Sequence, residues 1–109
     1  MSDTDIILVY MTAGSRAEAE QIGSVLVQER LAACVNVLDG MTSLYWWEDA
    51  VQHAQETVLI AKTQARNWDA LRARVLKVHS YKCPCIVAWP VTQGHGPFLD
   101  WIREQTDAG

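Results

Sequence analysis

Long apolar runs are missing from this chain of 109 residues. None approaches the roughly 20 apolar residues that a membrane-spanning helix needs, so we expect no membrane segment. The first five residues, Met1 to Asp5, have neither a basic region nor a cleavable apolar stretch, which does not fit a secretory signal. Basic charge is also scarce, since nine Lys and Arg stand against 13 Asp and Glu. A nucleic-acid-binding surface is typically basic, so we expect no nucleic-acid partner.

Cysteine is limited to three residues, an odd number that does not fit a disulfide framework. Reduced thiols are the rule in the cytoplasm, and we therefore expect a cytoplasmic protein. The length fits a single domain over residues 1–109. A domain of this size buries only about 60–70% of its unfolded surface, so oligomerisation is an obvious supplement. Five Trp and three Tyr indicate subunit contacts or a binding pocket, where such amphipathic rings are favoured.

Hydrophobic periodicity predicts the order β-α-β-β-α-β followed by a helical tail. Ser15 and Glu18 form a capping-box pattern at the start of the first helix, and a turn is expected at Asp49-Ala50. The predicted strands are 6–11, 34–47 with a break at Asp39-Gly40, 51–63 and 86–89, and the predicted helices are 15–31, 66–78 and 98–104. This order is the ferredoxin-like α/β (α+β) arrangement. Because prolines bracket it, the last strand is expected to lie at a sheet edge or to end abruptly. The long pair over 34–63 predicts a protruding hairpin that pairs with a neighbouring subunit.

Several segments in fixed order carry a resemblance to a known family: 29–36, 42–48, 60–63, 79–81, 90–91 and 98–102. Together they resemble the CutA family of divalent-cation-tolerance proteins, over nearly the whole chain. The resemblance implies a ferredoxin-like protomer in a homotrimer, similar in architecture to PII signalling proteins, and a link to copper and divalent-cation tolerance. It supplies no catalytic mechanism. The sequence offers no nucleophile with an adjacent base either, so we predict that the protein is not an enzyme.

The chain departs from the family pattern at two places. A stretch that commonly reads His-Pro-Tyr-Glu-x-Pro-Glu is here His79 to Cys85, and Lys82 and Cys85 replace two family carboxylates. A role that rests on those acids is therefore in doubt in this chain. The family's Gly-Lys is replaced by Asp49-Ala50, and Ala tolerates the left-handed conformation poorly, which predicts a different turn.

A thiol pair, Cys83 and Cys85, is the sharpest local feature. In an extended segment two residues that are two apart face the same side. Thiolates prefer Cu(I) or Zn(II), so copper or another divalent cation is the expected cofactor, with His79 or Cys34 as a third donor. The alternative is that these thiols are small buried hydrophobes. A single C-x-C pair also lacks the second pair that would make zinc-ribbon spacing convincing.

A second group of polar and aromatic residues matches family positions: Trp47, Glu48, Lys62 and Tyr81, with His79 beside them. We expect these residues at a cleft between subunits, where a lysine beside acidic and phenolic groups binds an anion. The alternative is an interfacial ion pair with aromatic packing. Three functions therefore stay open: a metal-binding tolerance trimer, a PII-like sensor or adaptor for an anionic ligand, and a structural trimer that anchors a partner protein.

Overall fold

Seven helices and strands follow one another along residues 4–107, the part of the chain that the computed structural model describes. In order they are β1 (Ile6–Ala13), α1 (Arg16–Gln28), β2 (Cys34–Trp47), β3 (Ala50–Gln64), α2 (Trp68–Val78), β4 (Ile86–Pro90) and α3 (Gly96–Thr106), with a short 3₁₀ turn (Ala65–Asn67) before α2. The predicted ferredoxin-like order is confirmed. None of the helices in this range is long and apolar enough to cross a membrane.

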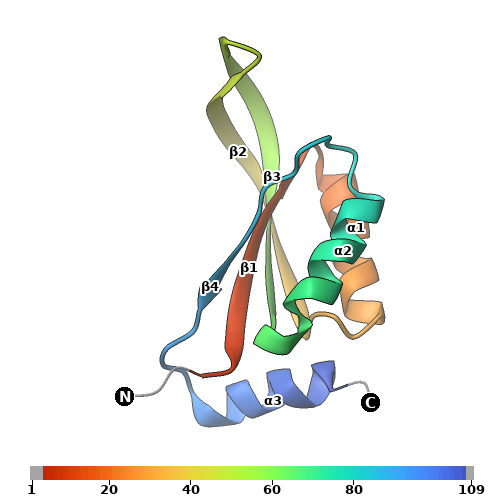
Figure 1. The fold of residues 1–109 in the computed structure, drawn as a ribbon, viewed down its shortest axis with the longest axis vertical. Coiled ribbons are helices and arrows are strands. Elements are labelled where there is room, and N and C mark those ends of the chain that lie inside the picture. The colour runs from red at the N-terminus through yellow and green to blue at the C-terminus, as the bar shows by residue number, and fades with distance from the viewer. Residues whose placement is uncertain (1–3, 108–109) are drawn as a thin grey trace.

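The four strands form one sheet in the order β2-β3-β1-β4, and all its pairs are antiparallel. The strand that proline brackets, β4, lies at an edge as predicted and pairs with β1 alone. The long strands β2 and β3 extend beyond the rest of the sheet as a hairpin, while α3 lies across the opposite end (Figure 1). The molecule therefore measures 44 × 30 × 23 Å.

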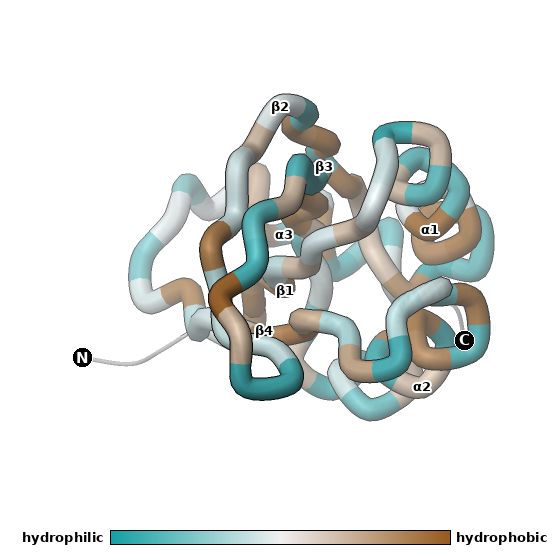
Figure 2. Tube along the Cα trace, turned by 90° about the horizontal axis from the view of Figure 1, so that it is seen from above, coloured by the Kyte–Doolittle hydropathy of each residue, from teal (hydrophilic) through white to brown (hydrophobic). Residues whose placement is uncertain are grey.

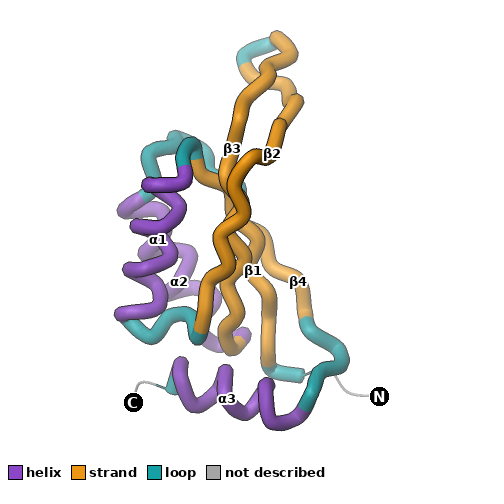
Figure 3. The backbone as a smooth tube through the Cα atoms, turned by 180° about the vertical axis from the view of Figure 1, so that it is seen from behind, coloured by secondary structure: helices purple, strands orange, loops and turns teal. Residues whose placement is uncertain are grey.

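One face of the sheet is covered by α1 and α2, which lie on the same side of the strands in two views (Figures 2 and 3). Residues of β1 at odd positions point into this layer, because side chains alternate along a strand. They pack with buried residues of both helices and of β3 in one core: Ile7, Val9, Met11, Ala13, Ala19, Ile22, Leu26, Leu59, Ala61, Leu71 and Val75. We call this side the covered face and the other side the open face.

The ends of α1 show how local sequence sets its bounds. Ser15 Oγ accepts the Glu18 N–H at 3.1 Å, which confirms the predicted N-cap. The helix ends at Gln28, earlier than predicted, because Arg30 has a left-handed φ of 63°. The Leu31 N–H then bonds back to the Leu26 carbonyl at 2.9 Å, which closes the helix as a Schellman turn.

The predicted break at Asp39-Gly40 is present as an irregularity of the ladder, although β2 itself continues through it. Leu38 pairs with Val58 and Met41 pairs with Glu56, so β2 holds one residue more than β3 between these pairs. This is a β-bulge: Gly40 takes a φ of 82°, and Asp39 Oδ1 accepts hydrogen bonds from the Gly40 N–H and the Thr57 hydroxyl. Because side chains alternate, the extra residue exchanges the faces that even and odd positions of β2 occupy.

The hairpin turn also differs from the prediction by one residue. Glu48 and Asp49 both have left-handed φ values, 51° and 63°, and Trp47 pairs with Ala50. Two consecutive left-handed residues are typical of the type I′ turn that joins twisted strands. Ala50 thus belongs to β3 and does not need the left-handed conformation.

Candidate functional site

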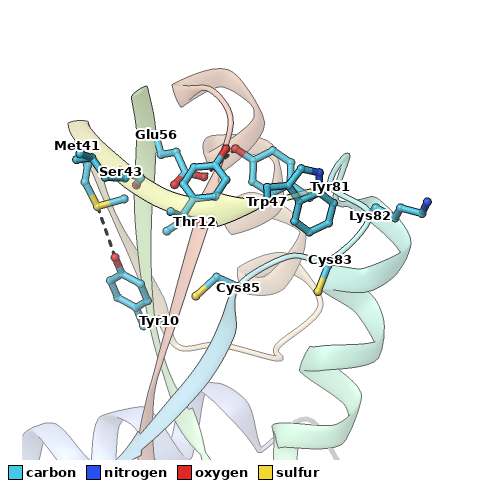
Figure 4. Close-up of a pocket in the computed structure, with 12 residues that line it drawn as sticks. Tyr10, Thr12, Met41, Ser43, Trp47, Glu56, Tyr81, Lys82, Cys83 and Cys85 are labelled. Atoms are coloured by element: carbon cyan, nitrogen blue, oxygen red, sulfur yellow. Dashed lines mark hydrogen bonds between the residues drawn. The ribbon is translucent and has the colours of Figure 1, made fainter. Parts of the chain in front are cut away.

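A pocket of about 540 Å³ lies on the open face between β1, the hairpin and the segment that leads into β4. Its lining combines aromatic rings, three sulfur atoms and few charges: Tyr10, Thr12, Met41, Ser43, Leu44, Tyr45, Trp47, Glu56, Tyr81, Lys82, Cys83 and Cys85. Figure 4 shows that these side chains come from β1, β2, β3 and the segment that leads into β4.

The bulge is what brings β2 into this pocket. Before it, even positions of β2 lie on the open face, since Leu38 pairs with Val58, the partner of Thr12 on β1. After it, odd positions take that face, and four of them line the pocket: Met41, Ser43, Tyr45 and Trp47. The bulge thus absorbs one residue that has no partner on β3, and it determines which side chains of β2 line the pocket.

The segment from His79 to Cys85 is held against the sheet by His79, whose side chain is fully buried. Its Nε2 lies 2.7 Å from the Thr12 carbonyl, and its Nδ1 lies 3.0 Å from the Tyr81 N. A carbonyl only accepts and a backbone N–H only donates, so Nε2 carries the proton and Nδ1 accepts. Both ring nitrogens are therefore engaged within the fold, and His79 positions this segment.

The same segment is tied to α1 by Glu18. Its carboxylate accepts the Ser80 N–H at 2.7 Å and the Gly14 N–H at 3.3 Å. Burial alone would raise the pKa of Glu18, but the hydrogen bonds from Ser80 and Gly14 outweigh it, and this pKa lies below its usual value. The ionised Glu18 carboxylate consequently connects the first helix to the segment that carries the thiols.

Tyr81 closes the upper wall of the pocket and donates its hydroxyl hydrogen to Glu56 Oε2 at 2.8 Å. Burial, and then the hydrogen bond to Glu56, raise the pKa of the Tyr81 phenol far above its usual value, so the phenol remains protonated. Its ring also packs against the His79 ring at a centroid distance of 4.7 Å. One oxygen of the Glu56 carboxylate is thus already hydrogen-bonded to the Tyr81 phenol.

Three sulfur atoms line the pocket, from Cys83, Cys85 and Met41. Both cysteines are exposed and carry free thiols, which does not fit their alternative interpretation as buried hydrophobes. Burial of its thiol, and then the charge of Glu56, raise the pKa of Cys85. Met41 is half-buried, and its sulfur accepts the Tyr10 hydroxyl at 3.5 Å.

Only some residues of each group that the sequence suggested lie in the pocket. Cys83, Cys85, Trp47 and Tyr81 line the pocket, whereas Cys34, Lys62 and Glu48 do not. Cys34 Sγ lies 3.6 Å from Lys62 Nζ, which also bonds to the Asn36 amide oxygen. Lys62 and Glu56 are six residues apart on β3, about 20 Å along the strand.

The full set of predicted metal ligands does not come together within one chain. Among residues 4–107, no three His, Cys, Asp or Glu side chains gather so as to hold a metal ion. His79 has no free ring nitrogen, and Cys34 lies at the other end of the β2–β3 ladder. The two pocket thiols are thus the members of this set that share a site.

Sequence reasoning missed Tyr10, Met41 and Glu56 as pocket residues. The first is hidden in an apolar strand, and the other two stand in a long hairpin without a motif of their own. The available signal was Asp39-Gly40, because a glycine after an aspartate inside a strand pattern suggests a bulge. Counting the alternation anew from Met41 would have placed it on the same face as Tyr45 and Trp47.

Comparison with known proteins identifies the family. A family model described as CutA1 divalent ion tolerance protein matches residues 7–105. The divalent-cation tolerance protein CutA of Thermus thermophilus is 43% identical over 99 residues, which span 91% of this chain and 96% of that protein. Its counterpart in Archaeoglobus fulgidus is 41% identical over the same shares of the two chains.

Solved structures agree with this result. The crystal structure of CutA from Xylella fastidiosa matches with a TM-score of 0.93 at 38% identity, over 95% of this chain and all of that one. The Thermus thermophilus structure matches with a TM-score of 0.91 at 42% identity, over 93% of this chain and 98% of that one. The resemblance found in the sequence is thereby confirmed, and the chain belongs to the CutA1 family of divalent ion tolerance proteins.

Proposed function

We propose that this chain is a cytoplasmic, single-domain, homotrimeric protein of divalent-cation tolerance, copper included, that binds the metal directly through Cys83 and Cys85. The observation that carries this proposal is the placement of both thiols in the lining of one pocket. Thiolates are strong ligands for copper and zinc, and free exposed thiols are available to a metal that enters from solvent. The names of the related proteins support the connection to cations.

Binding without catalysis fits the side chains around the pocket. A catalytic cysteine needs a base that takes its proton. His79, the histidine nearest to the thiols in sequence, uses both ring nitrogens to hold the backbone. Unpaired thiols also suit a reducing compartment, which supports the cytoplasmic assignment.

An anionic ligand is the weaker candidate for this pocket. Lys62, the lysine on which that alternative depended, lies outside it and bonds to Asn36. Lys82 is the cation in the lining, and the Glu56 carboxylate faces the same space. An anion would therefore meet one positive and one negative group, with no net attraction.

The trimer, which the family resemblance implies, is supported by the uncovered apolar side chains of the sheet and hairpin. On the open face, Trp89 is 49% exposed, Trp47 46% and Tyr45 43%. Apolar side chains left exposed in this way are typical of interaction surfaces. In the proposed trimer the open face is covered by neighbouring copies, and the pocket lies at a subunit boundary.

A metal titration tests the proposed ligands. Cu(I) and Zn(II) are titrated anaerobically into the reduced wild-type protein and into a Cys83→Ser/Cys85→Ser variant, with a chromophoric chelator as competitor. Cys34→Ser is the matched control, because it removes the thiol that lies outside the pocket. We expect the double variant to lose high-affinity binding and the control to keep it. Equal affinities in all three proteins would contradict the proposal.

Sedimentation velocity tests the trimer independently of the metal. The wild-type protein is expected to sediment as three copies of the 12.2 kDa chain. Trp89→Asp places a charge on the open face and should shift the protein towards monomer. Leu76→Asp is the control, since Leu76 is similarly exposed, at 44%, on the outer side of α2. A monomeric wild type would contradict the trimer, and the same behaviour in both variants would contradict the open face as its interface.

A further inference from the structure

We infer that the ion this pocket takes is a soft monovalent cation, Cu(I), and that Met41 supplies a third sulfur ligand beside Cys83 and Cys85. This inference rests on the proposed function, because it presupposes that the two thiols bind a metal. It adds a ligand from β2 that no sequence pattern indicated, and it narrows the metal from divalent cations in general to a soft ion.

The donor set argues against a hard divalent ion. Ca²⁺ and Mg²⁺ need about six oxygen ligands or more, mainly carboxylates, carbonyls and water. Among residues 4–107, Glu56 is the carboxylate that lines the pocket, and one of its oxygens already accepts the Tyr81 hydroxyl.

The sulfur atoms, in contrast, match what Cu(I) prefers. Soft thiolate and thioether ligands select Cu(I), which binds two or three such ligands. Cys83, Cys85 and Met41 all line the same pocket and reach it from two different parts of the chain. In Figure 4 the Cys83 and Cys85 side chains project from the segment before β4, and the Met41 sulfur lies on the other side of the pocket, near Tyr10.

Met41 is suited to the third position by its place in the fold. The bulge puts it on the open face, where it pairs with Glu56 on β3. Its sulfur accepts only a weak hydrogen bond, from the Tyr10 hydroxyl at 3.5 Å, so little is lost when it turns to a metal. The unbranched methionine side chain has three rotatable bonds, which allows the sulfur to swing towards the thiols.

The binding step balances without a change of oxidation state. Each thiol releases its proton to water, two copper–thiolate bonds form, and the Met41 thioether donates a lone pair without losing a proton. Two thiolates and one Cu(I) ion leave a single negative charge in the site. Lys82 and Glu56, which line the same pocket, contribute one positive and one negative charge, so the loaded pocket keeps a net charge of −1.

The experiment combines Cu(I) affinity with X-ray absorption of the bound copper. Wild type, Met41→Leu and Cys83→Ser/Cys85→Ser are loaded anaerobically with one equivalent of Cu(I), and affinity is measured by competition with bicinchoninate. Met11→Leu is the control, because Met11 is buried in the covered face, away from the pocket. Leucine conserves the volume of methionine, so both single variants should fold, and thermal unfolding verifies this.

We expect about three sulfur neighbours around copper in the wild type and about two in Met41→Leu, with an affinity lower by about tenfold or more. Met11→Leu should behave as wild type, and a tenfold excess of Zn(II) should not displace the Cu(I). An unchanged copper environment in Met41→Leu, or displacement by Zn(II), overturns this inference while thiol binding stands. Failure of the wild type to bind Cu(I) or Zn(II) at all overturns the proposed function as well.

Discussion

The two faces of the sheet use the same strands and similar apolar residues but have different surroundings. On the covered face, Val9, Leu26 and Leu59 are completely inaccessible to solvent, since α1 and α2 come from the same chain. On the open face, Val87 and Trp89 remain about half exposed, at 48% and 49%. One chain thus completes the layer under α1 and α2, whereas on the open face it buries only the end where Ile6 packs against Leu99 and Ile102 of α3. The comparison teaches that an apolar strand pattern predicts burial without saying which chain provides the cover.

The largest effect is expected from a cavity on the covered face. Leu26→Ala removes a fully buried side chain of α1 and should lower the free energy of unfolding by about 2–5 kcal/mol, because the close-packed core relaxes only partly. Urea unfolding followed by circular dichroism measures this loss. The loss should not depend on protein concentration, since the helices and the sheet belong to one chain.

The matched variant Val87→Ala removes an apolar side chain from the open face. At low protein concentration it should cost less than about 1 kcal/mol, because Val87 is half exposed in the single chain. At high concentration its cost should grow if neighbouring copies cover this face. Equal, concentration-independent losses in both variants would remove the distinction between the two faces.

An intermediate effect is expected at Glu18, which connects the covered face to the segment of the pocket thiols. Glu18→Gln removes the charge that two backbone N–H groups stabilise and should lower the free energy of unfolding by about 1–2 kcal/mol at neutral pH. Glu20→Gln on the same helix is the control. It breaks only an exposed pair with Arg16, which water screens, so the stability should change little.

The pH dependence of the Glu18 effect follows from the direction of its pKa. Folding lowers this pKa below the usual value of 4.5, so the stabilisation is fully present above pH 4.5 and is lost as the pH falls through the folded-state pKa. The difference between wild type and Glu18→Gln should therefore vanish in acid. The variant should also expose Cys83 more, and a faster reaction with a thiol reagent at neutral pH would show it. A difference that persists in acid would mean that charge is not the cause.

The smallest effect is expected in the hairpin, which extends past the covered face. Asp49→Gly should raise the free energy of unfolding by about 0.5–1 kcal/mol, because glycine adopts the left-handed φ of 63° without strain. Ala50→Gly should lower it by a similar amount, since Ala50 lies in β3 with ordinary strand geometry. Thermal unfolding of the two variants separates them. The opposite signs would place the turn at Asp49-Ala50, as the sequence alone suggested.

The fold was largely predictable because its strongest signals are local. The apolar run of β1, the Ser15 cap and the proline-bracketed β4 each act within a few residues, and each was confirmed. The errors came at positions where backbone conformation decides. Glu48 and Asp49 take left-handed φ values, which are not predicted for residues other than glycine. Arg30 ends α1 in the same way.

The site was predicted only in part, because a pocket is made by residues that are distant in sequence. Cys83 and Cys85 were recognised as a pair from their spacing, and their place in the pocket follows from the segment that His79 and Glu18 hold. Cys34 was added to them on chemical type alone, whereas Lys62 was grouped with Trp47 and Tyr81 because these residues match family positions. Antiparallel register places Cys34 and Lys62 near each other and far from the pocket, and only pairing of β2 with β3 reveals that distance.

The extra residue at Asp39-Gly40 has a consequence for comparing and redesigning proteins of this kind. Removal of Gly40 would place Asp39 opposite Thr57 and Met41 opposite Glu56, so β2 would pair with β3 without a bulge and each later side chain would keep its face. Met41, Tyr45 and Trp47 would therefore still line the pocket, although their position numbers would fall by one. A chain that lacks this residue presents the same wall from positions of the opposite parity. Alignments should therefore be anchored separately on each side of this glycine.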